Sequence, residues 1–207
     1  MKERTPTVFV VDDDEAVRSA LRLLLKSVGL ATTALPNAQA FLDSYDSQQP
    51  GCLVLDVRMP GMSGLELQEQ LNVRGAILPV IFMTGHGDIP MAVEAIQQGA
   101  FDFLQKPFRD QDLIDRIQRA LTKDKADRAE LNERTRIRER MEALTPRERE
   151  VLALVTSGKP NKVMAADLGV SQRTVEIHRA RVMEKMGAAS LAQLVRMVMD
   201  LDDSHSA

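Results

Sequence analysis

The chain has no tryptophan and a single cysteine, Cys52, among its 207 residues. One cysteine cannot form an intramolecular disulfide and has no metal-ligand spacing, so we expect Cys52 to lie in the hydrophobic core. All seven Phe and Tyr residues precede position 109, so the last 99 residues offer no aromatic ring for a nucleic-acid base to stack on. This absence argues against a single-strand-binding platform in that half of the chain.

Long hydrophobic runs are missing as well. No apolar stretch approaches the roughly 20 residues that a membrane-spanning helix needs. The opening residues, MKERTPTVFVV, show no apolar core followed by a small-residue cleavage site. We therefore expect a cytoplasmic protein that has no membrane partner. The length allows one large domain or two small ones.

Charge is distributed unevenly along the chain. Residues 1–121 hold 16 acidic and 11 basic side chains, whereas residues 145–201 hold 6 acidic and 9 basic ones. The C-terminal part is therefore the basic part of a chain whose net charge is −3. A modest basic excess is compatible with either a nucleic-acid partner or a protein partner.

Strand and helix patterns alternate through the first 121 residues. Apolar runs at 7–11, 31–35, 52–57, 79–84 and 101–106 indicate strands, and helical spacing follows each of them. Ser63 and Glu66 form a capping box for a helix over 64–73. Five such units predict an α/β doubly wound (βα)5 domain, with a parallel five-stranded sheet between two layers of helices.

The remaining residues indicate helices only. Residues 123–143 lack Gly and Pro and are rich in mixed charge, so we expect a largely solvated helical linker. Thr145, Pro146 and Glu148 suit the start of the next helix, and Ser171 suits the start of another. We predict a first domain over 6–122, the linker over 123–143, and an all-α four-helix domain over 144–207, with a helix-turn-helix at about 161–180.

Polar side chains follow four of the five predicted strands. Because ligands bind beyond the carboxyl ends of parallel strands, we expect these side chains to share one edge of the sheet. Clustered carboxylates need a cation between them, and hard oxygen ligands suit Mg²⁺. A carboxylate beside Mg²⁺ can also attack phosphorus and form an acyl phosphate. The residues in question are Asp12, Asp13, Asp56, Thr84 and Lys106.

Four stretches, VVDDDEAVR, LVLDVRMPGMSGLEL, PVIFMTGHGD and AFDFLQKPF, resemble the receiver domain of bacterial two-component response regulators. The resemblance implies that Asp56 accepts a phosphoryl group from a histidine kinase. It implies a cis peptide bond between Lys106 and Pro107. It also implies a set of ligands around Mg²⁺ (Asp12, Asp13, Asp56 and the carbonyl of Arg58, mainly the last three) and a set of switch and phosphoryl contacts (Thr84, Phe103 and Lys106).

An enzyme is the competing interpretation of this edge. Phosphohydrolases of the haloacid-dehalogenase type also use an Asp after a strand, with Mg²⁺, and place a general-acid Asp two residues later. That position here is Arg58, which cannot protonate a leaving group. We therefore predict that the chain is not an enzyme.

Residues 172–186 have the pattern of a helix that reads the major groove. Val175, Val182 and Met186 fall on one face, which we expect to pack inward, while the opposite face carries polar residues and two small apolar ones. The alternative is a small bundle that contacts protein. If the module binds double-stranded promoter DNA, the predicted contacts are Asn161, Lys162, Arg173, Thr174, Glu176, Ile177, Arg179, Ala180, Arg181 and Lys185.

The stretch LTPREREVLALVTSGKPNKVMAADLGVSQRTVEIHRARVMEKM resembles the four-helix DNA-binding domain of the LuxR/NarL/FixJ class. The resemblance implies a transcription activator that is a homodimer when phosphorylated and that works with RNA polymerase. FixJ-type members control nitrogen-fixation genes in response to low oxygen, and close relatives serve other pathways such as aromatic catabolism. A DNA-binding regulator that works without phosphorylation is the remaining alternative.

Overall fold

The computed structural model describes residues 4–85 and 89–202. The chain forms two compact units, which divide between Arg128 and Ala129. Two parts of our predictions lie outside the described residues: positions 86–88 of the motif around the fourth strand, and the tail 203–207 of the C-terminal domain.

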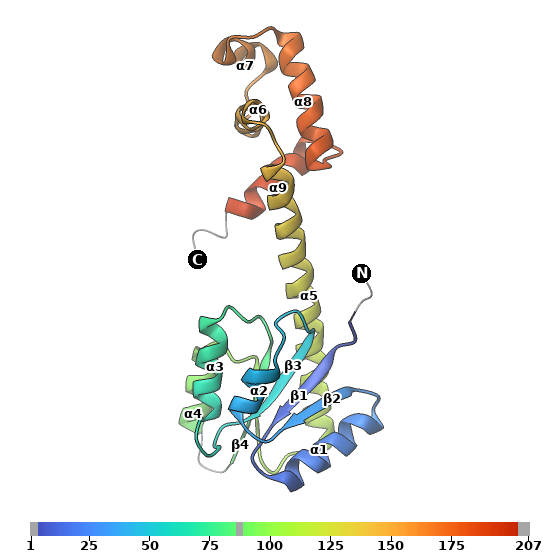
Figure 1. The fold of residues 1–207 in the computed structure, drawn as a ribbon, viewed down its shortest axis with the longest axis vertical. Coiled ribbons are helices and arrows are strands. Elements are labelled where there is room, and N and C mark those ends of the chain that lie inside the picture. The colour runs from blue at the N-terminus through green and yellow to red at the C-terminus, as the bar shows by residue number, and fades with distance from the viewer. Residues whose placement is uncertain (1–3, 86–88, 203–207) are drawn as a thin grey trace. The chain divides into compact units, whose positions relative to one another are not determined.

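The first unit contains a five-stranded parallel sheet, as predicted (Figure 1). Its spatial order is β2-β1-β3-β4-β5, which places β1 and β3 side by side in the interior of the sheet. The carboxyl ends of these two strands are therefore neighbours. The strands are β1 Thr7–Val11, β2 Ala31–Leu35, β3 Gly51–Asp56, β4 Val80–Thr84 and β5 Asp102–Gln105.

Alternate residues of each strand point to opposite faces of this sheet. Both faces carry buried apolar side chains, and helices cover both. On one face, Val10 and Val54 share a core with residues of α1 and α5. On the other, Val11 and Leu55 share a core with residues of α2, α3 and α4. Cys52 is buried as predicted, and burial raises the pKa of its thiol. The helices are α1 Glu15–Ser27, α2 Ala38–Ser44, α3 Gly64–Val73, α4 Ile89–Gln97 and α5 Asp110–Glu142.

Helix α5 contains both the last predicted helix of the first domain and the predicted helical linker. It runs without a break from Asp110 to Glu142, because no Gly or Pro interrupts it and ion pairs at i,i+4 spacing support it. Ile137 already belongs to the core of the second unit. The domain boundaries that we predict, at 122/123 and 143/144, lie on either side of the observed division between Arg128 and Ala129. Among the described residues, no helix, α5 included, has the length and apolar character to cross a bilayer.

The second unit is helical, with the capping residues that the sequence predicts. Thr145 and Glu148 form a capping box at the start of α6, and the Ser171 side chain accepts a hydrogen bond from the Thr174 amide at the start of α8. Gly169, with a φ of 64°, ends α7 in the left-handed conformation that permits the tight turn into α8. The helices are α6 Pro146–Thr156, α7 Asn161–Leu168, α8 Gln172–Met186 and α9 Leu191–Asp202.

Candidate functional site

The structure brings the predicted polar residues together at the carboxyl edge of the sheet. Asp12, Asp56 and Thr84 follow or end β1, β3 and β4, and they are 1%, 9% and 3% exposed. Lys106 follows β5 and reaches back across the edge toward β1 and β3. Burial of two carboxylates at one place requires a compensating positive charge.

The ammonium of Lys106 supplies this charge. Its Nζ donates to Oδ1 of Asp56 at 2.5 Å and to Oδ2 of Asp12 at 2.9 Å. Burial raises the pKa of Asp56 above its ordinary value, and the hydrogen bond from Lys106 opposes that rise. Burial lowers the pKa of Lys106, but its bonds to Asp56 and Asp12 outweigh this effect and leave the pKa raised. Lys106 is therefore held in its charged form between the two carboxylates.

The three consecutive acids after β1 have different surroundings. Asp14 caps helix α1, because its side chain accepts a hydrogen bond from the Ala16 amide at 2.8 Å. Asp12 is buried, and its Oδ1 accepts from the amide of Asp14 at 2.9 Å. Asp13 is exposed, so its carboxylate is open to a ligand from solvent.

Arg18, which the sequence does not single out, supports the backbone of this acidic turn. Its guanidinium is buried and donates to the backbone carbonyl oxygen of Asp12 at 2.7 Å. It also pairs with Glu15 in the first turn of α1. An arginine one turn into a helix is normally a solvated residue, so nothing in the local sequence distinguishes this one.

The loop after β3 supports the carboxylate of Asp56. The Arg58 amide donates to Oδ2 of Asp56 at 2.8 Å. Gly64 begins α3 against the same residue, since a Cβ at this position would lie 2.3 Å from the carbonyl oxygen of Asp56. The glycine therefore allows α3 to start immediately beside the end of the strand.

The donor atoms at this edge fit the chemistry of Mg²⁺. This ion commonly takes one or two carboxylates and keeps several waters, and a backbone carbonyl is also a suitable hard ligand. Within residues 4–85 and 89–202, no three His, Cys, Asp or Glu side chains are already arranged to hold a metal. A site made of two carboxylates, one carbonyl and water does not need such a trio. We therefore keep Asp12, Asp13, Asp56 and the carbonyl of Arg58 as the predicted ligands of Mg²⁺.

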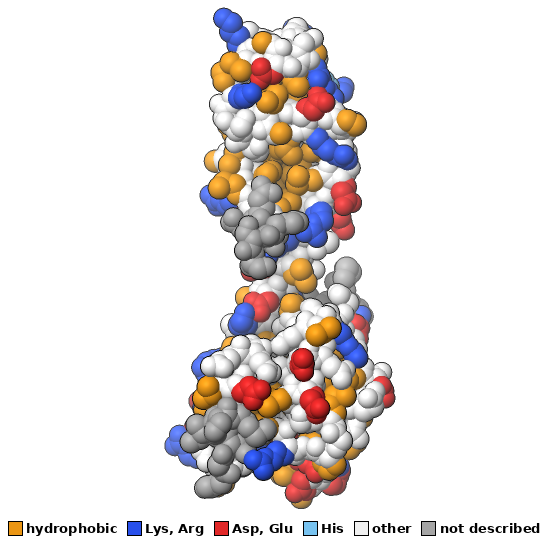
Figure 2. All heavy atoms as spheres, turned by 90° about the vertical axis from the view of Figure 1, so that its left-hand side faces the viewer, with side chains coloured by type: hydrophobic (Ala, Val, Ile, Leu, Met, Phe, Trp, Pro, Cys, Tyr) orange, Lys and Arg blue, Asp and Glu red, His pale blue; other side chains and the backbone are white. Residues whose placement is uncertain are grey.

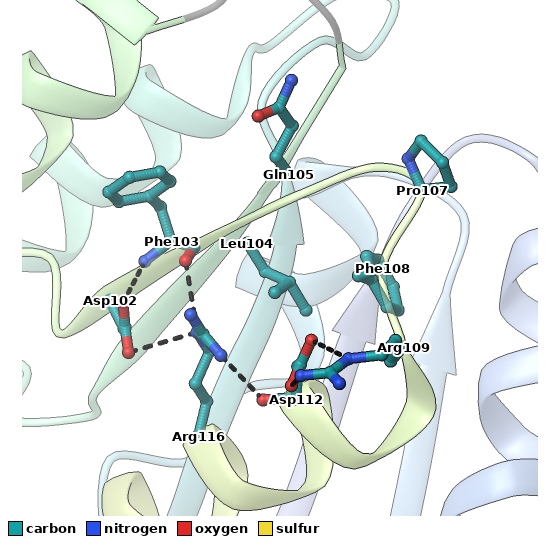
Figure 3. Close-up of a pocket in the computed structure, with 9 residues that line it drawn as sticks. All are labelled: Asp102, Phe103, Leu104, Gln105, Pro107, Phe108, Arg109, Asp112 and Arg116. Atoms are coloured by element: carbon teal, nitrogen blue, oxygen red, sulfur yellow. Dashed lines mark hydrogen bonds and ion pairs between the residues drawn. The ribbon is translucent and has the colours of Figure 1, made fainter.

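Phe103 and its neighbours form a second feature of the first unit (Figure 3). Phe103 is 39% exposed and lines a cavity of about 680 Å³ beside β5 and the start of α5. Arg116 donates to the Phe103 carbonyl oxygen at 3.3 Å and pairs with Asp102 at the same distance. The peptide bond between Lys106 and Pro107 is cis, as the resemblance implies.

Helix α8 of the second unit presents the predicted groove-reading face. Val175, Val182 and Met186 are buried, as expected. Glu176, Ile177 and Ala180 are exposed. Ile177 is a large apolar side chain that is nevertheless 47% exposed. A helix that turns small apolar and polar groups outward together offers contacts to base edges. Lys162, Arg173 and Arg181 are exposed as well.

Four of the predicted DNA contacts have partners inside the second unit. Arg179 donates to the side chain of Asn161, and the hydroxyls of Thr174 and Ser171 lie 2.8 Å apart. Lys185 donates to the buried carboxylate of Glu148 at 2.7 Å.

Positive charge on this unit is not concentrated in one patch in the view of Figure 2. There, Lys and Arg side chains are scattered among acidic and hydrophobic ones on both units.

Comparison with known proteins accounts for both units. Residues 8–118 match the response regulator receiver domain, and residues 142–198 match the luxR family of bacterial regulatory proteins. The chain is 51% identical to the transcriptional regulatory protein FixJ of Azorhizobium caulinodans, over 96% of this chain and 94% of that protein. It is 43% identical to the response regulator protein TodT of Pseudomonas putida, over 99% of this chain and 90% of that protein. The low-resolution structure of the response regulator StyR matches with a TM-score of 0.86 at 46% identity, over 94% and 98% of the two chains.

The chain belongs to the bacterial response regulators that join a receiver domain to a LuxR-type DNA-binding domain. Within that family it is similar to FixJ-type regulators over nearly its whole length. A histidine kinase and DNA are the partners that these two domains imply. The family consists of DNA-binding regulators of transcription rather than of classical enzymes.

Proposed function

We propose that this chain is a transcription activator whose DNA binding is switched on by phosphorylation of Asp56. The observation that carries the proposal is the position of Lys106, whose ammonium contacts both Asp56 and Asp12 at the open edge of the sheet. A cation held beside a carboxylate nucleophile is suited to compensate the charge of an incoming phosphoryl group.

In the proposed reaction, Oδ of Asp56 attacks the phosphorus of a phosphohistidine on the kinase. The phosphorus–nitrogen bond breaks, the imidazole leaves, and an acyl phosphate forms on Asp56. Lys106 then transfers one of its hydrogen bonds to a phosphoryl oxygen. Asp13, Asp56 and the carbonyl of Arg58, beside Asp12, would hold Mg²⁺, which supplies further charge compensation when bound.

Phosphorylation replaces the single negative charge of the Asp56 carboxylate with a phosphoryl group that carries about −1.5 to −2. We propose that the Thr84 hydroxyl and the Lys106 ammonium move toward this charge and that Phe103 rotates inward. Repacking of the exposed face around β5 would then favour a receiver homodimer. The partial exposure of Phe103 supports this role, because an exposed aromatic ring can gain burial by moving.

Dimerisation brings two DNA-binding domains to two half-sites and raises their affinity through effective concentration. We propose base contacts from Glu176, Ile177 and Ala180. Phosphate contacts would come from Lys162, Arg173 and Arg181, whose side chains are exposed. Asn161, Thr174, Arg179 and Lys185 would have to exchange an internal bond for a DNA contact. RNA polymerase is the further partner that activation requires.

We also propose the extent of each domain, the place in the cell where the chain acts and the pathway that it controls. The receiver over 6–122, the linker over 123–143 and the DNA-binding domain over 144–207 follow the two matched families closely. Binding to promoter DNA implies a cytoplasmic site of action in a bacterium. The identity with FixJ supports control of nitrogen-fixation genes under low oxygen. The likeness to TodT supports the alternative, the same architecture in another pathway such as aromatic catabolism.

The test is direct phosphorylation of the full chain. With acetyl phosphate and Mg²⁺, intact-mass spectrometry should show one added phosphoryl group on the natural protein and none on Asp56→Asn. Peptide mapping should place the group on Asp56. Equal labelling of the Asn variant, or no labelling of the natural protein, would contradict the proposal and favour a regulator that works without phosphorylation.

A further inference from the structure

A segment that the sequence indicates as solvated linker contains a buried carboxylate. Asp124 lies on α5, and its side chain is only 2% exposed. One of its oxygens accepts a hydrogen bond from the backbone amide of Gly51 at 2.9 Å. Both of its oxygens accept from Nε of Arg128, one turn further along the helix, also at 2.9 Å. The carboxylate is thus both paired with a cation and bonded to the sheet.

The guanidinium of Arg128 extends the same connection. Its Nη1 donates to the carbonyl oxygen of Ser47 at 2.8 Å, and its Nη2 donates to that of Gln49 at 3.0 Å. The two side chains therefore satisfy three backbone groups of the segment 47–51. The rigid fork of an arginine allows one side chain to bond a carboxylate and two carbonyls at once.

The segment that they hold is itself fixed in the sheet. Gly51 begins β3, and a Cβ there would lie 1.9 Å from the Thr7 carbonyl oxygen, so the two backbones are in close contact. Strand β3 runs from Gly51 to Asp56. The strand that carries the proposed phosphoacceptor at one end is therefore bonded to α5 at its other end.

The next part of α5 has no such support. Among the described residues, the side-chain hydrogen bonds and ion pairs of 129–136 stay within the helix itself, as in the exposed pair of Arg134 with Glu130. Leu131 is 51% exposed. Burial resumes only at Ile137, which is 3% exposed in the core of the second unit. A short helix without packing is marginally stable, so 129–136 is the weakest part of α5.

We propose that Asp124 and Arg128 form a latch that makes α5 part of the receiver as far as Arg128, so that residues 129–136 act as the joint between the two domains. The latch determines where the receiver's rigid body ends, and a change in the receiver is passed on through the joint. The regulatory part of this inference rests on the proposed function, in which phosphorylation controls DNA binding.

The latch is tested in the full chain by comparing Asp124→Ala with Asp127→Ala. Asp127 forms an i,i+4 ion pair with Lys123 on the same helix, but their side chains are 30% and 55% exposed, so this variant is a matched control. Alanine favours helix, so helix propensity cannot explain any loosening. Amide hydrogen exchange over 122–128 should be at least about tenfold faster in Asp124→Ala and within about twofold of natural in Asp127→Ala. Equal exchange in the two variants would overturn the latch.

A second measurement tests the regulatory role. Asp124→Ala should accept phosphate on Asp56 at the natural rate, within about twofold, which also shows that its receiver is folded. Its phosphorylation-dependent gain in DNA affinity should fall at least about fivefold relative to the natural gain. An unchanged gain despite faster exchange would overturn the role of the joint. No gain in the natural protein would instead contradict the proposed function, while the exchange result would still decide the latch.

A further variant keeps the test decisive if Asp124→Ala does not fold. Arg128→Lys keeps the positive charge beside Asp124, but a single ammonium cannot also reach the Ser47 and Gln49 carbonyls in the same geometry. It should show the same faster exchange over 122–128 and the same reduced gain in DNA affinity. Natural exchange and a natural gain in this folded variant would overturn the proposal.

Discussion

Replacing Lys106 with Met would remove the cation that contacts both Asp12 and Asp56. The two carboxylates, which are 2% and 12% exposed in their side chains, would then repel each other with no ammonium between them. Breaking a fully buried ion pair costs about 3–5 kcal/mol. Lys106 itself is 29% exposed, so solvent screening reduces the cost, and we expect a loss of about 1–3 kcal/mol from the receiver's free energy of unfolding.

Tyr45 allows this loss to be measured in the full chain. It is the single tyrosine, there is no tryptophan, and every aromatic residue precedes position 109, so tyrosine fluorescence reports on the first unit alone. Its ring stacks on Phe41 at 5.0 Å between centroids, so unfolding must change its surroundings. Urea titrations with EDTA present exclude any effect of divalent cations.

A double-mutant cycle provides the control. Asp56→Asn removes one of the two repelling charges, so Lys106→Met should cost less in that background than in the natural protein. A Lys106→Met variant as stable as the natural chain, or two substitutions that add without coupling, would contradict the role of Lys106 as the cation between the two carboxylates.

Three further predictions concern other parts of the molecule. Gly51→Ala places a Cβ 1.9 Å from the Thr7 carbonyl oxygen of β1, so the backbone must shift. The first unit should lose about 1–3 kcal/mol of its free energy of unfolding, measured by tyrosine fluorescence, and an unchanged midpoint would contradict this. The hydrogen bond from Lys185 lowers the pKa of Glu148 from 4.5 to about 2. The resulting stabilisation of the folded state is complete above the unfolded pKa of Glu148 and is lost as the pH falls through its folded pKa. Lys185→Met should therefore move acid unfolding of the second unit, followed by far-ultraviolet circular dichroism, to higher pH. Arg181→Ala should weaken DNA binding for all sequences and reduce the salt slope by about 1, whereas Glu176→Ala should change base preference and leave the slope as it is.

Local patterns in the sequence were sufficient for the strands, the helix starts and the main polar edge. Apolar runs located β1 and β3, and the capping boxes at Ser63 and Thr145 appear in the structure as predicted. Parallel topology then placed Asp12, Asp56 and Lys106 at one edge, because strands of one sheet must end side by side.

Contacts between residues distant in the sequence could not be predicted in this way. Asp124 lies in a run of alternating charges, and its burial depends on Gly51, which is 73 residues away. Arg18 is a similar case, since its partner is a backbone carbonyl, which carries no side-chain signal. The continuity of α5 was missed because a charged, Gly-free segment is compatible with both a separate linker and an extended helix.

The most direct test of this account is the affinity of the full chain for a DNA fragment before and after phosphorylation of Asp56. The fragment would be selected by the phosphorylated protein from random sequence, and oligomeric state would be followed by light scattering. We predict that phosphorylation produces a dimer that binds the fragment at least about tenfold more tightly, and that Asp56→Asn treated in the same way does neither. Equal affinity before and after phosphorylation, or the same gain in Asp56→Asn, would contradict the account.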